Sequence, residues 1–143
     1  MFRNPSDEEV VRLLRDVRRI ALIGWSARPE RPSHRVARFL ARQGYRIFPV
    51  NPGYAGRTVA DMGEVHAALE DIGEPIDMVD IFRRPEEAGA VVDAAIRIGA
   101  GAVWMQEGVI DEAAAERARA AGLTVVMDRC PAKEIPRLGL LRD

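Results

Sequence analysis

One stretch decides the fold: Ile20-Ala21-Leu22-Ile23-Gly24-Trp25-Ser26. Its four leading apolar residues, bounded by Arg19 and Gly24, are typical of a strand buried on both faces in a parallel sheet. Such a strand delivers the loop after it to the carboxyl edge of the sheet, where open α/β folds bind their ligands. The stretch therefore predicts the first strand and the phosphate-binding loop of a nucleotide-type binding domain.

Length and composition indicate one globular domain spanning residues 1–143. Of the 143 residues, 48% are apolar and 30% are charged, which is enough for a substantial core. The net charge of -1 argues against a general nucleic-acid binder, because such proteins usually carry a basic excess. Cys130 is the one cysteine, residues 1–16 lack the apolar core of a signal peptide, and no apolar run suits a membrane. We expect a cytoplasmic protein without a membrane segment.

Helix and strand patterns alternate along the rest of the chain. Ser6 and Glu9 have the spacing of a capping box, which predicts a helix from about Asp7 to Val17. Further helices are expected at 33–44, 62–72, 85–99 and 111–121, with Ser33 and Asp111 as caps, and strands at 20–23, 45–50, 76–82, 102–105 and 123–127. Residues 128–143 are mixed and broken by proline. This alternation predicts an α/β fold: a Rossmann-like, doubly wound parallel sheet of five strands in the order 3-2-1-4-5, with helices on both faces. In that order the switch point, where the strand order reverses direction, lies between the first and fourth strands.

Four loops are expected at the carboxyl edge of this sheet, at residues 24–33, 51–57, 82–85 and 106–110. The first suits a pyrophosphate, because Gly24 allows close approach of the backbone and the amides that open the Ser33 helix point at the anion. The nearby basic residues can add charge-assisted hydrogen bonds to further phosphates; they are Arg28, Arg31, His34 and Arg35. A tight turn with solvated arginines is the other interpretation of these residues.

The first two loops depart from the dinucleotide pattern. The segment Gly24-Trp25-Ser26-Ala27-Arg28-Pro29 lacks the second and third glycines of that fingerprint, and Val50-Asn51-Pro52 offers no carboxylate to a ribose. A ligand with a phosphorylated ribose would prefer such a neutral edge. Coenzyme A and NADP both meet that condition.

Several linked motifs carry a resemblance that covers the chain from about Leu14 to Leu138. They are Gly24-Trp25-Ser26, Gly44-Tyr45, Pro49-Val50-Asn51-Pro52, Asp77 through Phe82-Arg83-Arg84-Pro85, Val103-Trp104-Met105-Gln106-Glu107-Gly108 and Asp128-Arg129-Cys130. Together they resemble the small stand-alone CoA-binding protein family, which is similar to the CoA-binding domain of the succinyl-CoA synthetase alpha subunit. Members of that family are Rossmann-like cytoplasmic domains.

The resemblance implies a set of ligand contacts. Gly24, Trp25 and Ser26 would border the CoA phosphates, Val50, Asn51 and Pro52 would line the adenosine side, and Phe82 and Arg83 would close over the ligand. Charge and position add Arg28, Arg31 and Ser33, and the switch-point edge adds Gln106 and Gly108. Each of these contacts has an alternative interpretation. Phe82 can be a core residue, Arg83 can be solvated, and residues 106–108 can form a polar turn.

Catalytic interpretations have less support. By the resemblance, the synthetase reacts through a phosphorylated histidine on a second domain, which this chain lacks. His34 and His66 suit solvated or capping roles, no short His/Cys spacing indicates a metal site, and Asp77 and Asp80 do not form an acid/base pair. Cys130 can be either an inert buried thiol or a partner for the CoA thiol in a mixed disulfide.

The sequence therefore predicts a protein that binds coenzyme A or an acyl-CoA and has no autonomous catalysis. An NADP-binding reductase, a CoA-transfer or ligase component acting with a separate subunit, and a scaffold with a vestigial pocket are the alternatives. The acyl group, a homodimer and a partner subunit stay open.

Overall fold

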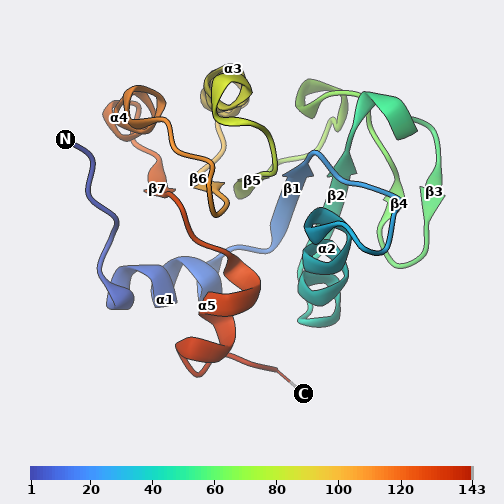
Figure 1. Ribbon diagram of the computed structural model, residues 1–143, viewed down its shortest axis with the longest axis horizontal. Coiled ribbons are helices and arrows are strands. Elements are labelled where there is room, and N and C mark those ends of the chain that lie inside the picture. Colours follow the sequence, from blue (N-terminus) through green and yellow to red (C-terminus); the bar gives the residue numbers. More distant parts are fainter. Residues whose placement is uncertain (143) are drawn as a thin grey trace.

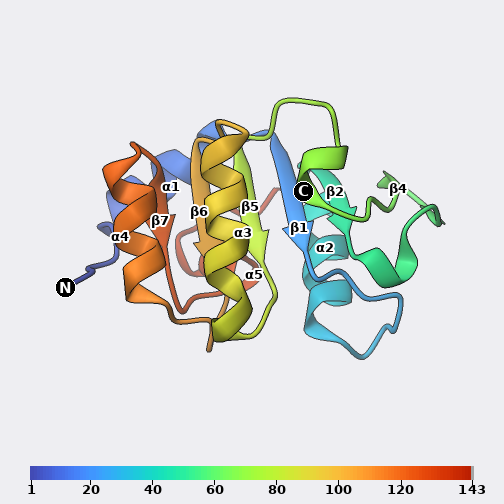
Figure 2. The same cartoon turned by 90° about the horizontal axis from the view of Figure 1, so that it is seen from above.

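The computed structural model describes residues 1–142, which form a parallel sheet between two layers of helices (Figure 1). The sheet strands are β1 (Arg19–Ile23), β2 (Arg46–Val50), β5 (Met78–Ile81), β6 (Ala102–Met105) and β7 (Thr124–Val126). One face is covered by α1 (Asp7–Asp16), α2 (Pro32–Arg42) and α5 (Pro131–Arg137), and the other by α3 (Pro85–Arg97) and α4 (Glu112–Ala120) (Figure 2). The predicted five-stranded doubly wound α/β fold is confirmed.

The predicted strand order is wrong. The order is β2-β1-β5-β6-β7. β5, the third of these strands along the chain, pairs with β1 and not with β2, so the switch point lies between β1 and β5. Pro49 gives a physical reason: proline has no N–H for a ladder, so a strand that contains it suits the edge of a sheet. The order 3-2-1-4-5 would have placed this strand between two neighbours.

The two faces of β1 bury different sets of side chains, because successive residues of a strand point to opposite faces. Ala21 and Ile23 pack into the layer of α3 and α4. Ile20 and Leu22 pack into the layer of α1, α2 and α5. The apolar run therefore forms the centre of the core, as its composition indicates.

The long connection from β2 to β5 differs most from expectation. It contains the turn η1 (Pro52–Tyr54), a hairpin of β3 (Thr58–Val59) and β4 (Gly63–Glu64), and the turn η2 (Leu69–Asp71). The helix expected at 62–72 does not form, and His66 lies in an isolated parallel bridge with Val50. Asp61 and Gly63 have φ values of 69° and 85°, which no continuous helix accommodates.

Helix ends follow the predicted signals in part. The capping box of Ser6 and Glu9 is confirmed, and the Asp111 side chain caps α4 by accepting from Ala114 N at 3.0 Å. Ser33 is not a cap, since α2 begins one residue earlier with Arg31 at the N-cap position. Pro131, at the first position of α5, starts a helix in the segment expected to be mixed.

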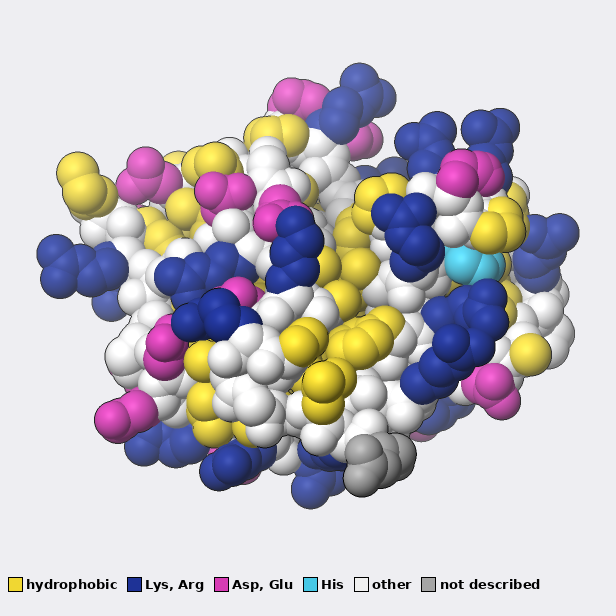
Figure 3. All heavy atoms as spheres, turned by 60° about the horizontal axis from the view of Figure 1, so that its bottom comes forward, with side chains coloured by type: hydrophobic (Ala, Val, Ile, Leu, Met, Phe, Trp, Pro, Cys, Tyr) yellow, Lys and Arg dark blue, Asp and Glu magenta, His cyan; other side chains and the backbone are white. Residues whose placement is uncertain are grey.

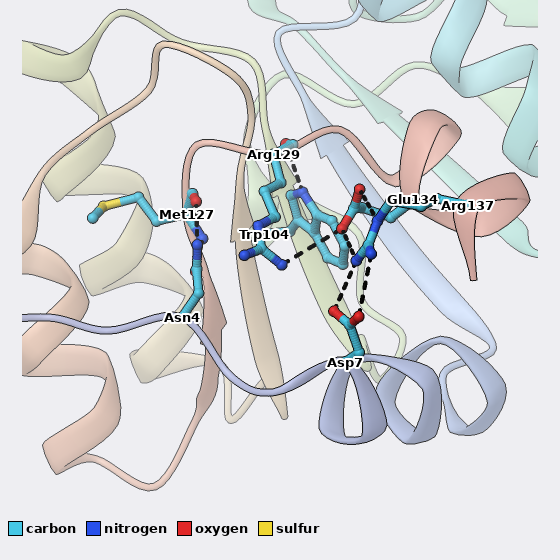
Figure 4. A network of polar contacts seen from close by, with 7 residues as sticks. All are labelled: Asn4, Asp7, Trp104, Met127, Arg129, Glu134 and Arg137. Atoms are coloured by element: carbon cyan, nitrogen blue, oxygen red, sulfur yellow. Dashed lines mark hydrogen bonds and ion pairs between the residues drawn. The ribbon is translucent and has the colours of Figure 1, made fainter.

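Polar contacts join the two ends of the chain (Figure 4). Asn4 Nδ2 donates to Met127 O at 2.9 Å, and Met127 N donates to Asn4 Oδ1 at 2.8 Å. Arg137 pairs with Asp7 at 2.8 Å and with Glu134 at 2.9 Å, and its hydrogen bonds lower the pKa of Asp7. Among the described residues no helix is both long and apolar enough to span a bilayer.

Candidate functional site

A cleft of about 710 Å³ opens at the carboxyl edge of the sheet. It is bounded by the loops after β1, β2, β5 and β6 and by the start of α2. These are the four loops that the sequence predicts at this edge. The predicted site residues that line the cleft are Gly24, Ser26, Arg31, Ser33, Asn51, Phe82, Arg83, Gln106 and Gly108.

Gly24 lies at the switch point, where the ends of β1 and β5 come close together. Its φ is +94°, and a Cβ built on it would overlap the carbonyl oxygen of Phe82. Its N–H donates to Val50 O at 2.8 Å, which holds the loop against β2. Only glycine has both the conformation and the space that this turn requires.

Asn51 holds the same loop from the neighbouring strand. Its Nδ2 donates to Trp25 O at 2.7 Å, and its Oδ1 accepts from Gly53 N at 2.9 Å. Both polar atoms of the side chain are therefore occupied within the protein. The primary role of Asn51 in this structure is to position the loop.

Trp25 lies beneath the loop and does not line the cleft. Only 2% of its surface is exposed, and its ring packs against His34 and Tyr54 with centroid distances of 5.8 and 5.5 Å. Its Nε1 has no hydrogen-bond partner in the described part of the chain. Trp25 therefore supports the loop through packing.

The remaining predicted residues divide between two places. Val50 and Pro52 line a smaller pocket of about 250 Å³, which shares Arg83 with the cleft and is bounded by apolar side chains of α3 such as Val91. Arg28 is exposed and lies outside the lining of both. The apolar pocket thus adjoins the cleft at Arg83, and we consider the two together as the candidate site.

Charge in the cleft is distributed unevenly. Arg31 and Arg83 form no ion pair with any acid of residues 1–142, whereas Arg84 contacts Glu87 at 3.4 Å. Glu107, at the far end, binds Lys133 at 2.9 Å, and this contact raises the pKa of the lysine. The part of the cleft lined by Arg31 and Arg83 is therefore the part suited to an anion.

Gln106 is positioned by a buried acid. Asp80 in β5 is fully buried, and burial raises its pKa well above the ordinary carboxyl value. With the amide oriented to satisfy its surroundings, Gln106 Nε2 donates to Asp80 Oδ1 at 2.9 Å. Asp80 therefore fixes a side chain of the cleft wall from inside the sheet.

Some lining residues were missed, although all of them except Glu87, which lies in α3, belong to loops that were predicted at this edge. They are Pro32, Tyr54, Arg84, Glu87 and Val109. Tyr54 belongs to the predicted 51–57 loop and Arg84 to the 82–85 loop, but a loop sequence carries no periodicity that tells which side chains face inward.

Other reactive groups lie apart from one another. Asp77 accepts from the backbone of Arg18 and Arg19 at 2.8 Å, at the opposite edge of the sheet from the cleft. Cys130 is buried at the start of α5 and lines another cavity, of about 330 Å³, which shares Glu107 with the cleft. No group of three His, Cys, Asp or Glu residues among 1–142 is placed to hold a metal ion.

Residues 18–136 match the family model of the CoA binding domain, and the chain belongs to this family. The uncharacterized protein YneT of Bacillus subtilis is 38% identical over 131 residues, which cover 90% of this chain and 93% of that protein. The predicted family resemblance is thus confirmed.

Solved structures show the same fold. The cell-free ID.343 protein from Thermus thermophilus has a TM-score of 0.88 at 36% identity, covering 94% of this chain and 99% of its own. A hypothetical protein from Pyrococcus horikoshii OT3 has a TM-score of 0.88 at 34% identity, covering 96% and 97%. The dinucleotide-forming acetyl-coenzyme A synthetase 1 of Ca. Korarchaeum cryptofilum shares the fold over 77% of this chain and 26% of its own, with a TM-score of 0.65 at 18% identity.

Proposed function

We propose that the protein binds coenzyme A or an acyl-CoA in the cleft and performs no chemistry on it alone. One observation carries the proposal. The unpaired guanidinium groups of Arg31 and Arg83 line a cleft whose floor is the close backbone turn at Gly24. A guanidinium group binds phosphate oxygens in a bidentate manner, and the start of α2 adds the positive end of a helix dipole.

The parts of the ligand would follow the chemistry of the lining. The phosphates would lie beside Gly24, Ser26, Arg31 and Ser33. The adenosine would use the apolar pocket at Val50 and Pro52, with Asn51 and Trp25 holding the loop between them. The pantetheine would extend under Phe82 and Arg83 toward Gln106 and Gly108.

We further propose a cytoplasmic protein without autonomous catalysis, acting on a small molecule and not on nucleic acid or a membrane. The single buried thiol of Cys130 suits a reducing compartment. Among the described residues, the cleft hydroxyls of Ser26 and Ser33 form no hydrogen bond with a His, Asp or Glu side chain that could act as a base, which supports the binding role.

Titration calorimetry with CoA, NADP and ATP tests the proposal. Loss of a charge-assisted hydrogen bond amounts to about 1.5–3 kcal/mol, so Arg31→Ala should weaken CoA binding by about 10-fold or more. Arg28→Ala is the matched control, because this arginine lies in the same loop but outside the lining. Equal or tighter NADP binding, or equal loss in both variants, would contradict the proposal.

A further inference from the structure

A second cavity of about 460 Å³ lies between α2 and the loop that joins β3 to β4. It shares no lining residue with the cleft at the carboxyl edge. Its volume falls within the range of about 300–1,000 Å³ that is usual for small-molecule sites. We refer to it as the α2 groove.

One wall of the α2 groove is a basic stripe. His34, Arg38 and Arg42 line it, and a spacing of four residues places them on one side of α2. Like charges at this spacing destabilise a helix, and neither arginine forms an ion pair with an acid among residues 1–142. The repulsion between Arg38 and Arg42 is thus not relieved by an ion pair with a neighbouring acid.

The surrounding surface strengthens the positive charge. Residues 28–57 contain seven arginines and one acid, Glu30, in a chain whose net charge is -1. Basic side chains gather around a histidine on the α2 side of the molecule in Figure 3. Asp61 is the one carboxylate in the groove lining, so the field there stays positive.

His34 has one ring nitrogen committed and one available. Nδ1 lies 2.8 Å from the carbonyl oxygen of Ser26. A carbonyl oxygen only accepts, so Nδ1 carries the hydrogen and donates. Nε2 is then left to accept when the ring is neutral, or to donate to an anion when the ring is protonated.

The opposite wall is less polar. Val59 of β3 and Met62 of the β3–β4 loop line the groove together with Ala41 of α2. A ligand therefore meets guanidinium groups along one wall and aliphatic surface along the other. This combination suits a molecule with an anionic group on an apolar body.

We propose that the α2 groove is a second binding site, for a small organic anion whose phosphate or carboxylate lies on Arg38, Arg42 and His34 and whose apolar part packs on Val59 and Met62. The site shares no lining residue with the CoA cleft, although His34 also contacts the cleft loop through the Ser26 carbonyl. A guanidinium pair accepts either anion, so the two sources are distinguished by experiment.

Amide and imidazole NMR of the full chain, saturated with CoA, tests this site with phenyl phosphate and benzoate as probes. Saturable shifts at residues 34–42 and 59–62 and at the His34 ring are expected for the preferred anion. Inorganic phosphate, which lacks the apolar part, should bind more weakly than phenyl phosphate. Because the groove shares no residue with the cleft, repeating the titration without CoA separates this proposal from the proposed function.

The double variant Arg38→Gln, Arg42→Gln should lower probe affinity about 10-fold or more, the effect of losing one strong charged contact. Both arginines are exposed, so the variant should fold. Arg35→Gln on the same helix is the matched control, since Arg35 does not line the groove. Absence of saturable shifts with either probe, or an equal loss in the control, would overturn the proposal.

Discussion

Replacement of Gly24 by alanine tests the geometry of the phosphate loop directly. The left-handed φ of +94° costs a residue with a side chain about 1–2 kcal/mol. The added Cβ would also overlap the backbone carbonyl of Phe82, whose N–H donates to Ile23 O at 2.8 Å. Because a backbone atom cannot rotate away, β1 and β5 must separate, and such overpacking costs about 1–3 kcal/mol. We expect Gly24→Ala to lose about 2–5 kcal/mol of stability.

Gly122 supplies a matched control for this prediction. Its φ is +93°, nearly the value at Gly24, but an added Cβ would meet no atom within 4 Å. Gly122→Ala should therefore lose only the conformational part, about 1–2 kcal/mol. The difference between the two variants isolates the contact with Phe82.

Urea unfolding of the two variants, followed by circular dichroism, measures both free energies of unfolding. CoA titration of the folded Gly24→Ala protein should also show weakened binding, since its loop is displaced from the cleft floor. Equal destabilisation of the two variants would refute the argument that close approach to Phe82 requires glycine at position 24.

Three further predictions concern stability. Burial raises the pKa of Asp80 in the folded state, so folded protein keeps a proton that unfolded protein loses. Stability should then fall by about 1.4 kcal/mol per pH unit as pH rises from the ordinary carboxyl pKa toward the raised one. Asp80→Asn, which still accepts from Gln106, should flatten this slope in urea unfolding at a series of pH values. An unchanged slope would contradict the assignment of the slope to Asp80. Asn4→Ala removes both hydrogen bonds to Met127 and should cost about 1–3 kcal/mol, measured by thermal unfolding; an unchanged midpoint would contradict a stabilising role for this contact. Ser6→Ala should cost about 1 kcal/mol through loss of the α1 cap, and an unaltered urea midpoint would show that the cap does not stabilise the helix.

Local signals predicted most of the fold because they act through nearby atoms. The apolar run at β1 and the capping box at Ser6 each depend on a few consecutive residues. Strand order depends on pairing between distant segments, which periodicity does not encode. Pro49 held the relevant information, since its missing N–H favours an edge strand.

The segment 62–72 shows how a correct pattern can accompany the wrong element. Met62, Val65, Leu69 and Ile72 have helical spacing, and all four are buried. They reach the core from irregular backbone: Met62 lies in the turn before β4, Val65 just after β4, Leu69 in η2 and Ile72 directly after η2. Gly63, with a φ of +85°, breaks the backbone between Met62 and Val65. The helical spacing therefore coincides with the buried positions, although the helix predicted over 62–72 is wrong.

The candidate site was predicted at the level of loops more successfully than at the level of side chains. Gly24 was recognisable because it follows a buried strand directly. Trp25 and Asn51 have structural tasks that depend on partners elsewhere in the chain, His34, Tyr54 and the Trp25 carbonyl. The hydrogen bond from Gln106 to Asp80 joins the end of β6 to the neighbouring strand β5, and only the register of these two strands reveals it.

The pairing of Asn4 with Met127 has a consequence for solubility. The outer strands of an open sheet present free backbone groups that recruit strands of other molecules into aggregates. Asn4 occupies the N–H and carbonyl of Met127 just beyond β7, and His66 bonds Pro49 and Asn51 along β2. The amino-terminal segment and the β2–β5 connection therefore cover backbone groups at the two edges of the sheet, and they oppose the addition of strands from other molecules.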